Sequence, residues 1–252
     1  MLTRENYFSK EMNLRYMSVS QFKSFMQCEA GALAEINGEV EREKSVCLLV
    51  GSYVDSYFSN NLDLFKAQNP EIFLKGKVEL KSEYNHADYI IERIERDPMM
   101  MKYLSGEKQV IKTGEIEGVL FKSMIDSYHI GKAIVDLKIV KDLSKMWKDG
   151  LKLSFVEFWK YDFQASVYCT LEGNNLPFFI AAATKEKPEP DLAIISIPQE
   201  RLDFCLDIVK QNVKRFDDIK KGLIEPTRCE QCSYCRKTKV LTQIISYEDI
   251  GN

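Results

Sequence analysis

Two acids and one lysine stand at spacings that suit the hydrolysis of phosphodiester bonds. Asp126 lies in one apolar stretch, and Asp136 and Lys138 lie in the next, with Gly131 between the stretches. The glycine favours a tight turn between two β-strands. Because side chains along a strand point alternately to its two faces, Asp136 and Lys138 share a face, while Leu137 and its apolar neighbours pack on the other. The acid and the lysine can therefore reach one reaction centre.

The paired carboxylates predict a bound cation. Asp126 and Asp136 on neighbouring strands repel each other unless a hard cation lies between them. Mg²⁺ takes carboxylates, water molecules and phosphate oxygens as ligands, and Mn²⁺ accepts a similar set. Next to such an ion, Lys138 can orient or deprotonate a water molecule, or stabilise the charge that develops on a phosphate. Taken alone, the same three residues also fit a hairpin with solvated charges on its outer face.

A second motif follows on a predicted helix. Gln164 and Tyr168 are four residues apart, so they project from the same face of that helix. The amide and the phenol can contact a DNA backbone or orient the lysine. The alternative is an ordinary helix with one buried tyrosine and one exposed glutamine.

In their order and spacing, these motifs resemble the PD-(D/E)xK nuclease superfamily. Asp126 and the tripeptide 136–138 resemble its D…(D/E)xK signature, and Gln164-xxx-Tyr168 resembles the QxxxY motif of its RecB-like branch. The resemblance extends to phage and prophage exonucleases similar to exodeoxyribonuclease VIII, and more distantly to λ exonuclease. Each short motif is common by itself, so the inference depends on finding them together.

The resemblance implies a role for each motif residue. The implied catalytic residues are Asp126, Asp136, Lys138, Gln164 and Tyr168. Asp126 and Asp136 would bind the metal ion, and the backbone carbonyl of Leu137 would complete its ligand shell. Gln164 and Tyr168 would also contact the DNA.

One position departs from the resembled pattern. RecB-like nucleases usually carry Gly-xxx-His in the helix before the sheet, with the histidine as a metal ligand, whereas this chain has Gly51-xxx-Asp55. Aspartate is itself an oxygen ligand for Mg²⁺ or Mn²⁺, and an unpaired carboxylate within this apolar helix would be costly. We therefore predict Asp55 as a further metal ligand. The alternative is an exposed helical aspartate that binds nothing.

Four cysteines form a second candidate metal site. Cys229, Cys232 and Cys235 are each three residues apart near the end of the chain, and thiolates at such spacing can surround one soft metal. Cys28 resembles the distant first cysteine of RecB-like nucleases, in which a [4Fe–4S] cluster joins the ends of the chain, although the final spacing here is shorter. The sequence leaves three interpretations of these cysteines open: a [4Fe–4S] cluster, a Zn²⁺ ion, or four reduced thiols.

Hydrophobic periodicity predicts an α/β fold in which helices flank a mixed central β-sheet, the restriction-endonuclease-like core that the resemblance also implies. Residues 1–16 show little periodicity and predict an extended N-terminal arm. The predicted helices cover residues 18–37, 45–60, 83–103, 156–171 and 201–221, with an interruption of the third at Asp97-Pro98. The predicted strands cover residues 109–116, 119–128, 132–140, 176–184 and 192–197. Residues 222–252 form a C-terminal tail that carries three of the cysteines.

Length and composition favour one domain over residues 1–252. The chain has 252 residues, of which 45% are hydrophobic and 29% charged, as in ordinary globular proteins. The net charge of -3 neither indicates nor excludes DNA, because a nuclease can gather positive charge along its substrate groove. The polar first residues, the short apolar runs and the odd number of cysteines predict a cytoplasmic protein with no membrane partner.

These features predict a Mg²⁺-dependent exonuclease that degrades duplex DNA, of the phage and prophage recombination type. By the resemblance, it would resect one strand, pass the other to a single-strand annealing protein, and be able to act as a homo-oligomer. Two alternatives stay open. One is a single-strand or structure-specific nuclease of the RecB-like or CRISPR-associated type with an iron–sulfur cluster. The other is a catalytically silent DNA-binding relative in which Asp55 marks a decayed metal site.

Overall fold

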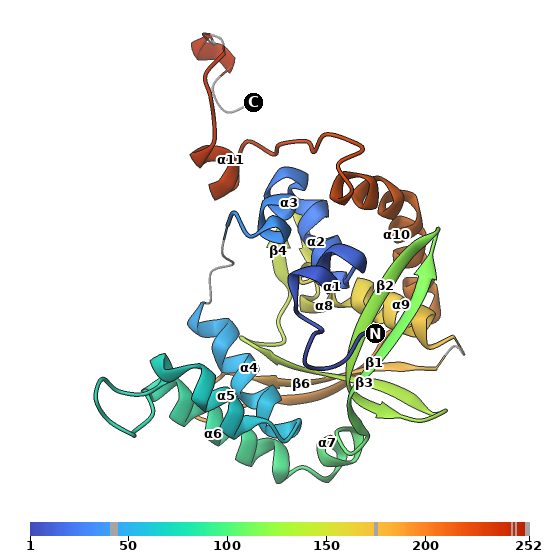
Figure 1. Cartoon of the computed structure of the whole chain (residues 1–252). Helices are drawn as coiled ribbons and strands as arrows, with labels where there is room; N and C mark the ends of the chain where they lie inside the picture. Colours follow the sequence, from blue (N-terminus) through green and yellow to red (C-terminus); the bar gives the residue numbers. More distant parts are fainter. Residues whose placement is uncertain (41–44, 174–175, 243, 245, 250–252) are drawn as a thin grey trace.

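A five-stranded mixed sheet forms the centre of the molecule in the computed structural model, which describes residues 1–40, 45–173, 176–242, 244 and 246–249. The strands are β1 (Glu107–Ile116), β2 (Val119–His129), β3 (Ala133–Val140), β6 (Phe178–Thr184) and β7 (Leu192–Ser196). Their order across the sheet is β1-β2-β3-β6-β7. Strands β3 and β6 are parallel, and the other neighbours are antiparallel. The predicted mixed central sheet is confirmed (Figure 1).

Helices cover both faces of this sheet (Figure 1). On one face lie α2 (Val19–Gln27), α9 (Tyr161–Glu172) and α10 (Gln199–Lys220). On the other lie α4 (Val46–Phe58), α6 (Ser82–Glu95) and α7 (Pro98–Tyr103). The remaining helices are α1 (Lys10–Arg15), α3 (Glu29–Asn37), α5 (Leu62–Gln68), η1 (Pro70–Ile72), α8 (Phe155–Phe158), α11 (Ser233–Lys237) and η2 (Tyr247–Asp249). Among the described residues, no helix has the length and apolar character needed to cross a membrane.

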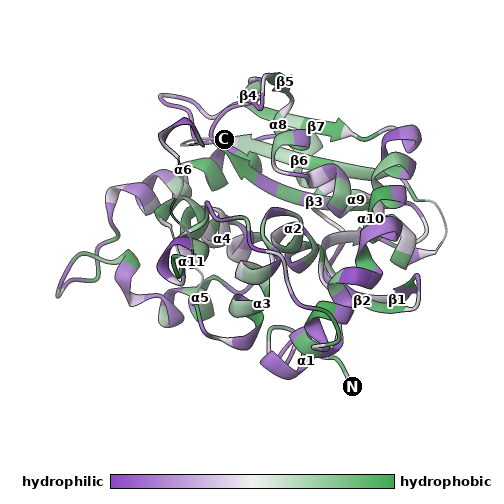
Figure 2. Cartoon of the chain, turned by 90° about the horizontal axis from the view of Figure 1, so that it is seen from above, coloured by the Kyte–Doolittle hydropathy of each residue, from purple (hydrophilic) through white to green (hydrophobic). Residues whose placement is uncertain are grey.

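The alternation of side chains along β3 builds a hydrophobic core on each side of the sheet. Ile134 and Val140 pack with α2, α9 and α10, whereas Leu137 packs with α4 and α6. Asp136 and Lys138 fall in the same alternation as Ile134 and Val140. They therefore put a polar segment on the face that α2 and α9 cover, and the strand changes colour there in Figure 2.

The predicted helices are present, and the one over residues 83–103 divides at Asp97-Pro98 into α6 and α7, as expected. Two others break where no interruption is predicted. The helix expected over residues 18–37 is interrupted at Cys28, an extended residue that ends α2 and begins α3. The helix expected over residues 156–171 is interrupted at Lys160, whose φ of 54° is left-handed. The hydrophobic pattern continues across both breaks, so the pattern alone does not reveal them.

Further regions differ from the sequence prediction, among them α5, which lies outside every predicted element. The N-terminal arm is not extended throughout, because α1 forms within it and buries Met12 against the rest of the protein. A small hairpin, β4 (Met146–Lys148) with β5 (Leu151–Leu153), lies outside every predicted element. The end of the predicted C-terminal tail, residues 250–252, lies outside the described residues.

A buried carboxylate joins α3 to the last part of the chain. Glu29 is 8% exposed and accepts two hydrogen bonds from Arg215 of α10, at 2.7 and 2.8 Å. It also accepts hydrogen bonds from the backbone N–H and the hydroxyl of Thr227, at 2.7 and 2.6 Å. Although burial opposes its charge, these donors lower the pKa of Glu29 to about 2. One side chain thus fixes both α10 and the segment after it against α3.

We expect Glu29→Ala to lower the free energy of unfolding by about 2 to 3 kcal/mol, because it leaves the partners of a buried carboxylate unpaired. Lys214→Ala is the matched control, since it removes an exposed ion pair with Asp218 on α10 and should cost about 0.5 kcal/mol or less. Urea unfolding of the two variants and the parent protein measures both values. Equal losses in the two variants would contradict the role assigned to Glu29.

Candidate functional site

The regular pairing of β2 and β3 ends where the predicted acids lie. The two strands pair as far as Ser127 opposite Val135. Beyond that point, the backbone N–H of Leu137 donates to Oδ2 of Asp126 at 3.1 Å. A side chain therefore links the two strands where the backbone ladder has stopped, and it places the Asp126 carboxylate between them.

Asp136 is 2% exposed, and each of its oxygens has a partner. Nε2 of Gln164 on α9 donates to Oδ1 at 2.7 Å. Oδ2 forms an ion pair with Nζ of Lys138, although no described residue gives it a hydrogen bond of good geometry. The structure thus brings together the acid and lysine of the first motif and the glutamine of the second.

The other two acids lie within electrostatic range of this group. Burial raises the pKa of Asp126 well above its usual value, and the carboxylates of Asp136 and Asp55 raise it further. Burial also raises the pKa of Asp55 to about 6, with Asp136 adding to the rise, while Lys138 opposes both shifts. The protein therefore gathers three carboxylates, and the repulsion among them opposes the ionisation of Asp126 and Asp55.

Lys138 keeps its charge in these surroundings. Although burial disfavours the ammonium group, the carboxylates of Asp136 and Asp126 raise the pKa of Lys138 above its usual value. Its Nζ lies 5.0 Å from the ring centroid of Tyr161, and Nζ of Lys23 on α2 lies 5.1 Å from the same centroid. Two lysines from different elements thus approach one aromatic ring beside Asp136.

Tyr168 takes a different position from its motif partner Gln164. It is 9% exposed and packs edge to face on Phe178 of β6, with the ring centroids 6.3 Å apart. Burial raises the pKa of Tyr168 well above its ordinary value. While Gln164 reaches the buried acid, Tyr168 helps to pack α9 against the sheet.

The three carboxylates suit a hard divalent cation. Mg²⁺ and Mn²⁺ take oxygen ligands, and a cation near these acids would relieve the repulsion that raises the pKa values of Asp126 and Asp55. The carbonyl of Leu137 is the backbone oxygen between Asp136 and Lys138 on β3. Among the described residues, the oxygens of these acids gather less tightly than the sulfurs of the four cysteines described below. Lys138 and Gln164 both contact the carboxylate of Asp136 and hold it in place.

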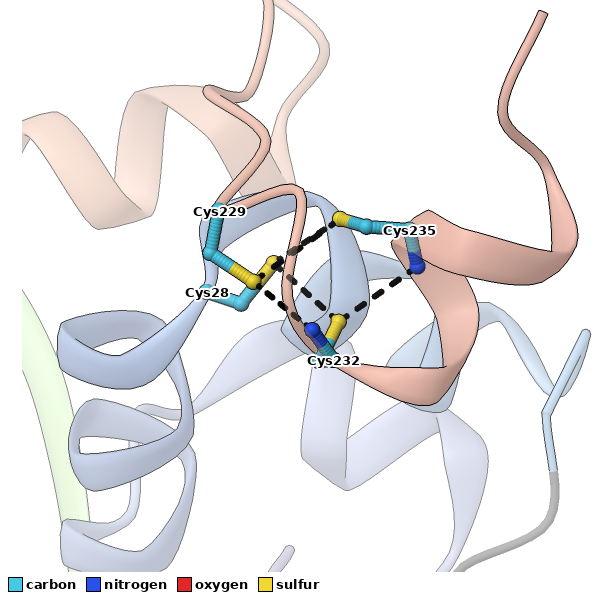
Figure 3. A group of neighbouring side chains, drawn as sticks. All are labelled: Cys28, Cys229, Cys232 and Cys235. Atoms are coloured by element: carbon cyan, nitrogen blue, oxygen red, sulfur yellow. Dashed lines mark hydrogen bonds between the residues drawn. The ribbon is translucent and has the colours of Figure 1, made fainter. Parts of the chain in front are cut away.

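Four cysteine sulfurs converge where α3 meets the C-terminal segment (Figure 3). The Sγ atoms of Cys28, Cys229, Cys232 and Cys235 all lie within 4.8 Å of one another. Backbone N–H groups of Gly31, Cys232 and Cys235 each donate to one of these sulfurs, at 3.3 to 3.4 Å. The predicted set of four residues is therefore assembled in space, although Cys28 and Cys235 are 207 residues apart.

The spacing of the sulfurs bears on which metal they would hold. Four thiolates at about 2.3 Å from one zinc ion lie about 3.8 Å from each other, as the corners of a tetrahedron. Three of the sulfur separations are 3.5, 3.7 and 4.0 Å, close to that value. In a [4Fe–4S] cluster each thiolate binds a different iron, which holds the sulfurs further apart than a single ion does. The residues fit one four-coordinate ion, and they fit a cluster less well.

The sequence motifs do not single out Lys23 or Tyr161. Tyr161 precedes Gln164 by three residues on α9, so a shared helix face is the signal that could have found it. Lys23 stands between the buried residues Phe22 and Phe25 on α2. No spacing relates Lys23 to the motif residues, because their proximity depends on how α2 packs on the sheet.

Comparisons with known proteins give a family and a close relative. A family model described as a PDDEXK-like domain of unknown function matches residues 18–238. The crystal structure of a putative exonuclease from Eubacterium rectale shares 48% sequence identity, with a TM-score of 0.94 over 100% of this chain and 98% of that chain. The crystal structure of SSO0001 shares 15% identity, with a TM-score of 0.32 over 82% of this chain and 90% of that one. Among curated proteins, none matches this sequence.

The raised acid pKa values predict how the stability of the metal-free protein depends on pH. Some carboxyl groups have a higher pKa in the folded state than in the unfolded chain. The contribution of such a group to the free energy of unfolding is fully present below about pH 4, and it is lost as the pH rises through the pKa of the folded state. For Asp55 the folded value is about 6. We therefore expect the melting temperature of metal-free protein to fall by several degrees from about pH 5 to about pH 7.5, and Mn²⁺ to restore it mainly at the higher pH.

Asp126→Asn provides the control for this pH profile, because it removes one of the repelling charges and keeps the shape of the side chain. We expect its melting temperature to vary less with pH over the same range and to respond less to Mn²⁺. Scanning calorimetry of both proteins, after dialysis against EDTA, measures the difference. Superimposable profiles would show that carboxylate repulsion is not the cause.

Proposed function

We propose a function that follows from the family of this chain. The chain belongs to the family of PDDEXK-like domains and is a nuclease. The proposed activity is that of a metal-dependent exonuclease, which hydrolyses phosphodiester bonds of duplex DNA. The observation that carries the proposal is the contact of Asp136 with both Lys138 and Gln164, because it joins two separate sequence motifs in one site. The likeness to a putative exonuclease at 48% identity supports the same activity.

The proposed metal ligands are Asp55, Asp126, Asp136 and the backbone carbonyl of Leu137. When bound, Mg²⁺ or Mn²⁺ would polarise a phosphate oxygen and lower the pKa of a water ligand. The N–H of Leu137 orients Asp126, and the amide of Gln164 orients Asp136. Both carboxylates are thus held in place by groups that are part of the sheet or of α9.

We assign charge stabilisation to Lys138. The surrounding carboxylates favour its ammonium form, and an ammonium group cannot take a proton from water. It can hold a phosphate oxygen as negative charge builds on that oxygen, or orient the attacking water. The sequence leaves three roles open for Lys138: to orient the water, to deprotonate it, or to stabilise charge on the phosphate. The charged form of Lys138 does not support the second of these, the role of general base.

The finer parts of the proposal rest on the resemblance to phage and prophage exonucleases. They are the preference for duplex DNA, a role in recombination in the cytoplasm, transfer of the remaining strand to a single-strand annealing protein, and assembly as a homo-oligomer. Gln164 would contact DNA close to the bond that is cut. Tyr168 is buried, which favours a role in positioning α9 over a direct contact with the phosphate backbone.

The four cysteines support a second candidate, a RecB-like nuclease whose C-terminal tail is held by a metal. We propose that Cys28, Cys229, Cys232 and Cys235 bind one Zn²⁺ ion, because their sulfur separations are close to those of a tetrahedral site. The ion would be structural, since all four positions are taken by thiolates. This candidate shares the catalytic residues and differs in its substrate, which would be single-stranded or branched DNA.

We expect Asp136→Ala and Lys138→Ala each to lower Mg²⁺-dependent hydrolysis of end-labelled DNA by at least about a hundredfold, since each removes a group that stabilises charge at the reacting phosphate. Lys141→Ala is the matched control, because Lys141 is almost fully exposed and follows Lys138 by three residues. Assays with duplex and single-stranded substrates, with and without Mg²⁺, also separate the two candidate functions. Wild-type rates in either site variant would remove the nuclease site as assigned.

We expect the purified chain to contain about one zinc ion, and Cys232→Ser to lose it and melt several degrees lower, because binding free energy at such a site is also folding free energy. Cys47→Ser changes an exposed cysteine outside the cluster and should keep both metal and stability. Elemental analysis and thermal melting measure the two properties. A brown, iron-containing protein from anaerobic preparation would instead show a [4Fe–4S] cluster, and a metal-free protein as stable as its serine variant would show reduced thiols.

A further inference from the structure

Trp159 is a large aromatic residue that the fold leaves exposed. It follows α8 directly and is 52% exposed. The ring of Phe158 meets its indole edge to face, with the centroids 4.9 Å apart. Nζ of Lys148, on β4, lies 5.8 Å from the Phe158 ring. An accessible indole therefore stands next to a second aromatic ring and a lysine.

Lys23 connects Trp159 to the proposed catalytic site. Its Nζ donates to the backbone carbonyl of Trp159 at 3.0 Å. The same Nζ lies 5.1 Å from the ring centroid of Tyr161, and Nζ of Lys138 lies 5.0 Å from that centroid. Trp159, Lys23 and Lys138 thus mark a short path from the surface to the buried carboxylate of Asp136.

The charge available along this path is positive. Two acids close to it are already engaged, because Asp162 forms an ion pair with Arg201 at 2.6 Å and Glu157 caps the start of α8. Burial and the neighbouring Lys138 lower the pKa of Lys23 to about 7, so an anion beside Lys23 would favour its charged form. The path is suited to a chain of phosphates that leads to the catalytic acids.

We propose that Trp159 stacks on an unpaired nucleobase of the DNA strand that is cut, and that Lys23 binds a phosphate of the same strand. The proposal rests on the proposed nuclease function and specifies its substrate, since the strand must be single-stranded at the site. That strand is either single-stranded DNA or the separated end of a duplex. Within a duplex each base stacks on its neighbours, so an exposed indole finds a free base face only where the strand is unpaired or ends.

Intrinsic fluorescence can test the proposal because the chain has two tryptophans. Trp147→Phe leaves Trp159 as the sole tryptophan, and Trp159→Phe leaves Trp147. Each variant is titrated in EDTA, which prevents cleavage, with a 5′-phosphorylated oligonucleotide of about twelve thymidines. We expect quenching of Trp159 emission by this oligonucleotide, and weaker quenching by a blunt duplex of the same length.

Binding affinity gives a second measurement. Trp159→Ala should weaken binding of the oligonucleotide about tenfold, as expected for the loss of one stacked base. Lys23→Gln should lower the slope of log Kd against log salt concentration by about 0.7, the value for one phosphate contact on a single strand. Phe8→Ala removes another exposed aromatic ring, 76% exposed on the N-terminal arm, and should change neither quantity. Thermal melting shows that each variant is folded.

Two results would overturn the proposal: Trp159 emission that stays constant at the highest oligonucleotide concentration, or equal affinities of Trp159→Ala and Phe8→Ala. Either result would leave the proposed nuclease function standing, because that function is measured by Mg²⁺-dependent hydrolysis in the parent protein. Quenching of Trp159 in a protein that hydrolyses no DNA would support the stacking site and contradict the nuclease activity.

Discussion

The buried charge of Asp136 is the constraint on which the arrangement of the site depends. An ionised carboxylate inside a protein is costly unless it is paired and hydrogen-bonded. Lys138 comes from the same strand, but Gln164 must come from α9, so this helix has to lie with Gln164 over β3. Tyr161 and Tyr168 then take their places from the helix period, one near the lysines and one in the core. Packing of α9 and placement of the proposed catalytic acid are thus one requirement.

The start of α3 meets a similar constraint at the other end of the molecule. Cys28 and Glu29 are neighbours in sequence, and both bind the segment that follows α10, one through sulfur and the other through its carboxylate. The break between α2 and α3 is what allows this, because the extended Cys28 can turn its sulfur towards the C-terminal cysteines. The same residue ends one helix, caps the next and joins the ends of the fold.

Sequence predicts the parts of this protein that follow from local periodicity. Asp126 and Asp136 lie in apolar runs of strand length, so the positions of these strands are predictable, and the two-residue period of a strand gives Asp136 and Lys138 a shared face. The helix of Gln164 is predictable from its own period. The break at Cys28 is not predictable in this way, since apolar residues continue on both sides of it. Lys23 is missed for a different reason, because its nearness to Lys138 is set by packing between elements distant in the chain.

The contact between Cys28 and the C-terminal cysteines has a consequence for how this protein folds during translation. The four sulfurs include Cys28, which leaves the ribosome early, and Cys235, which follows 207 residues later. Residues of the proposed catalytic site, such as Asp136 and Gln164, are made between them. Because domains tend to fold as units while synthesis proceeds, the sheet and its acids can assemble first on the nascent chain, whereas α3 gains its last partners only when synthesis has passed Cys235.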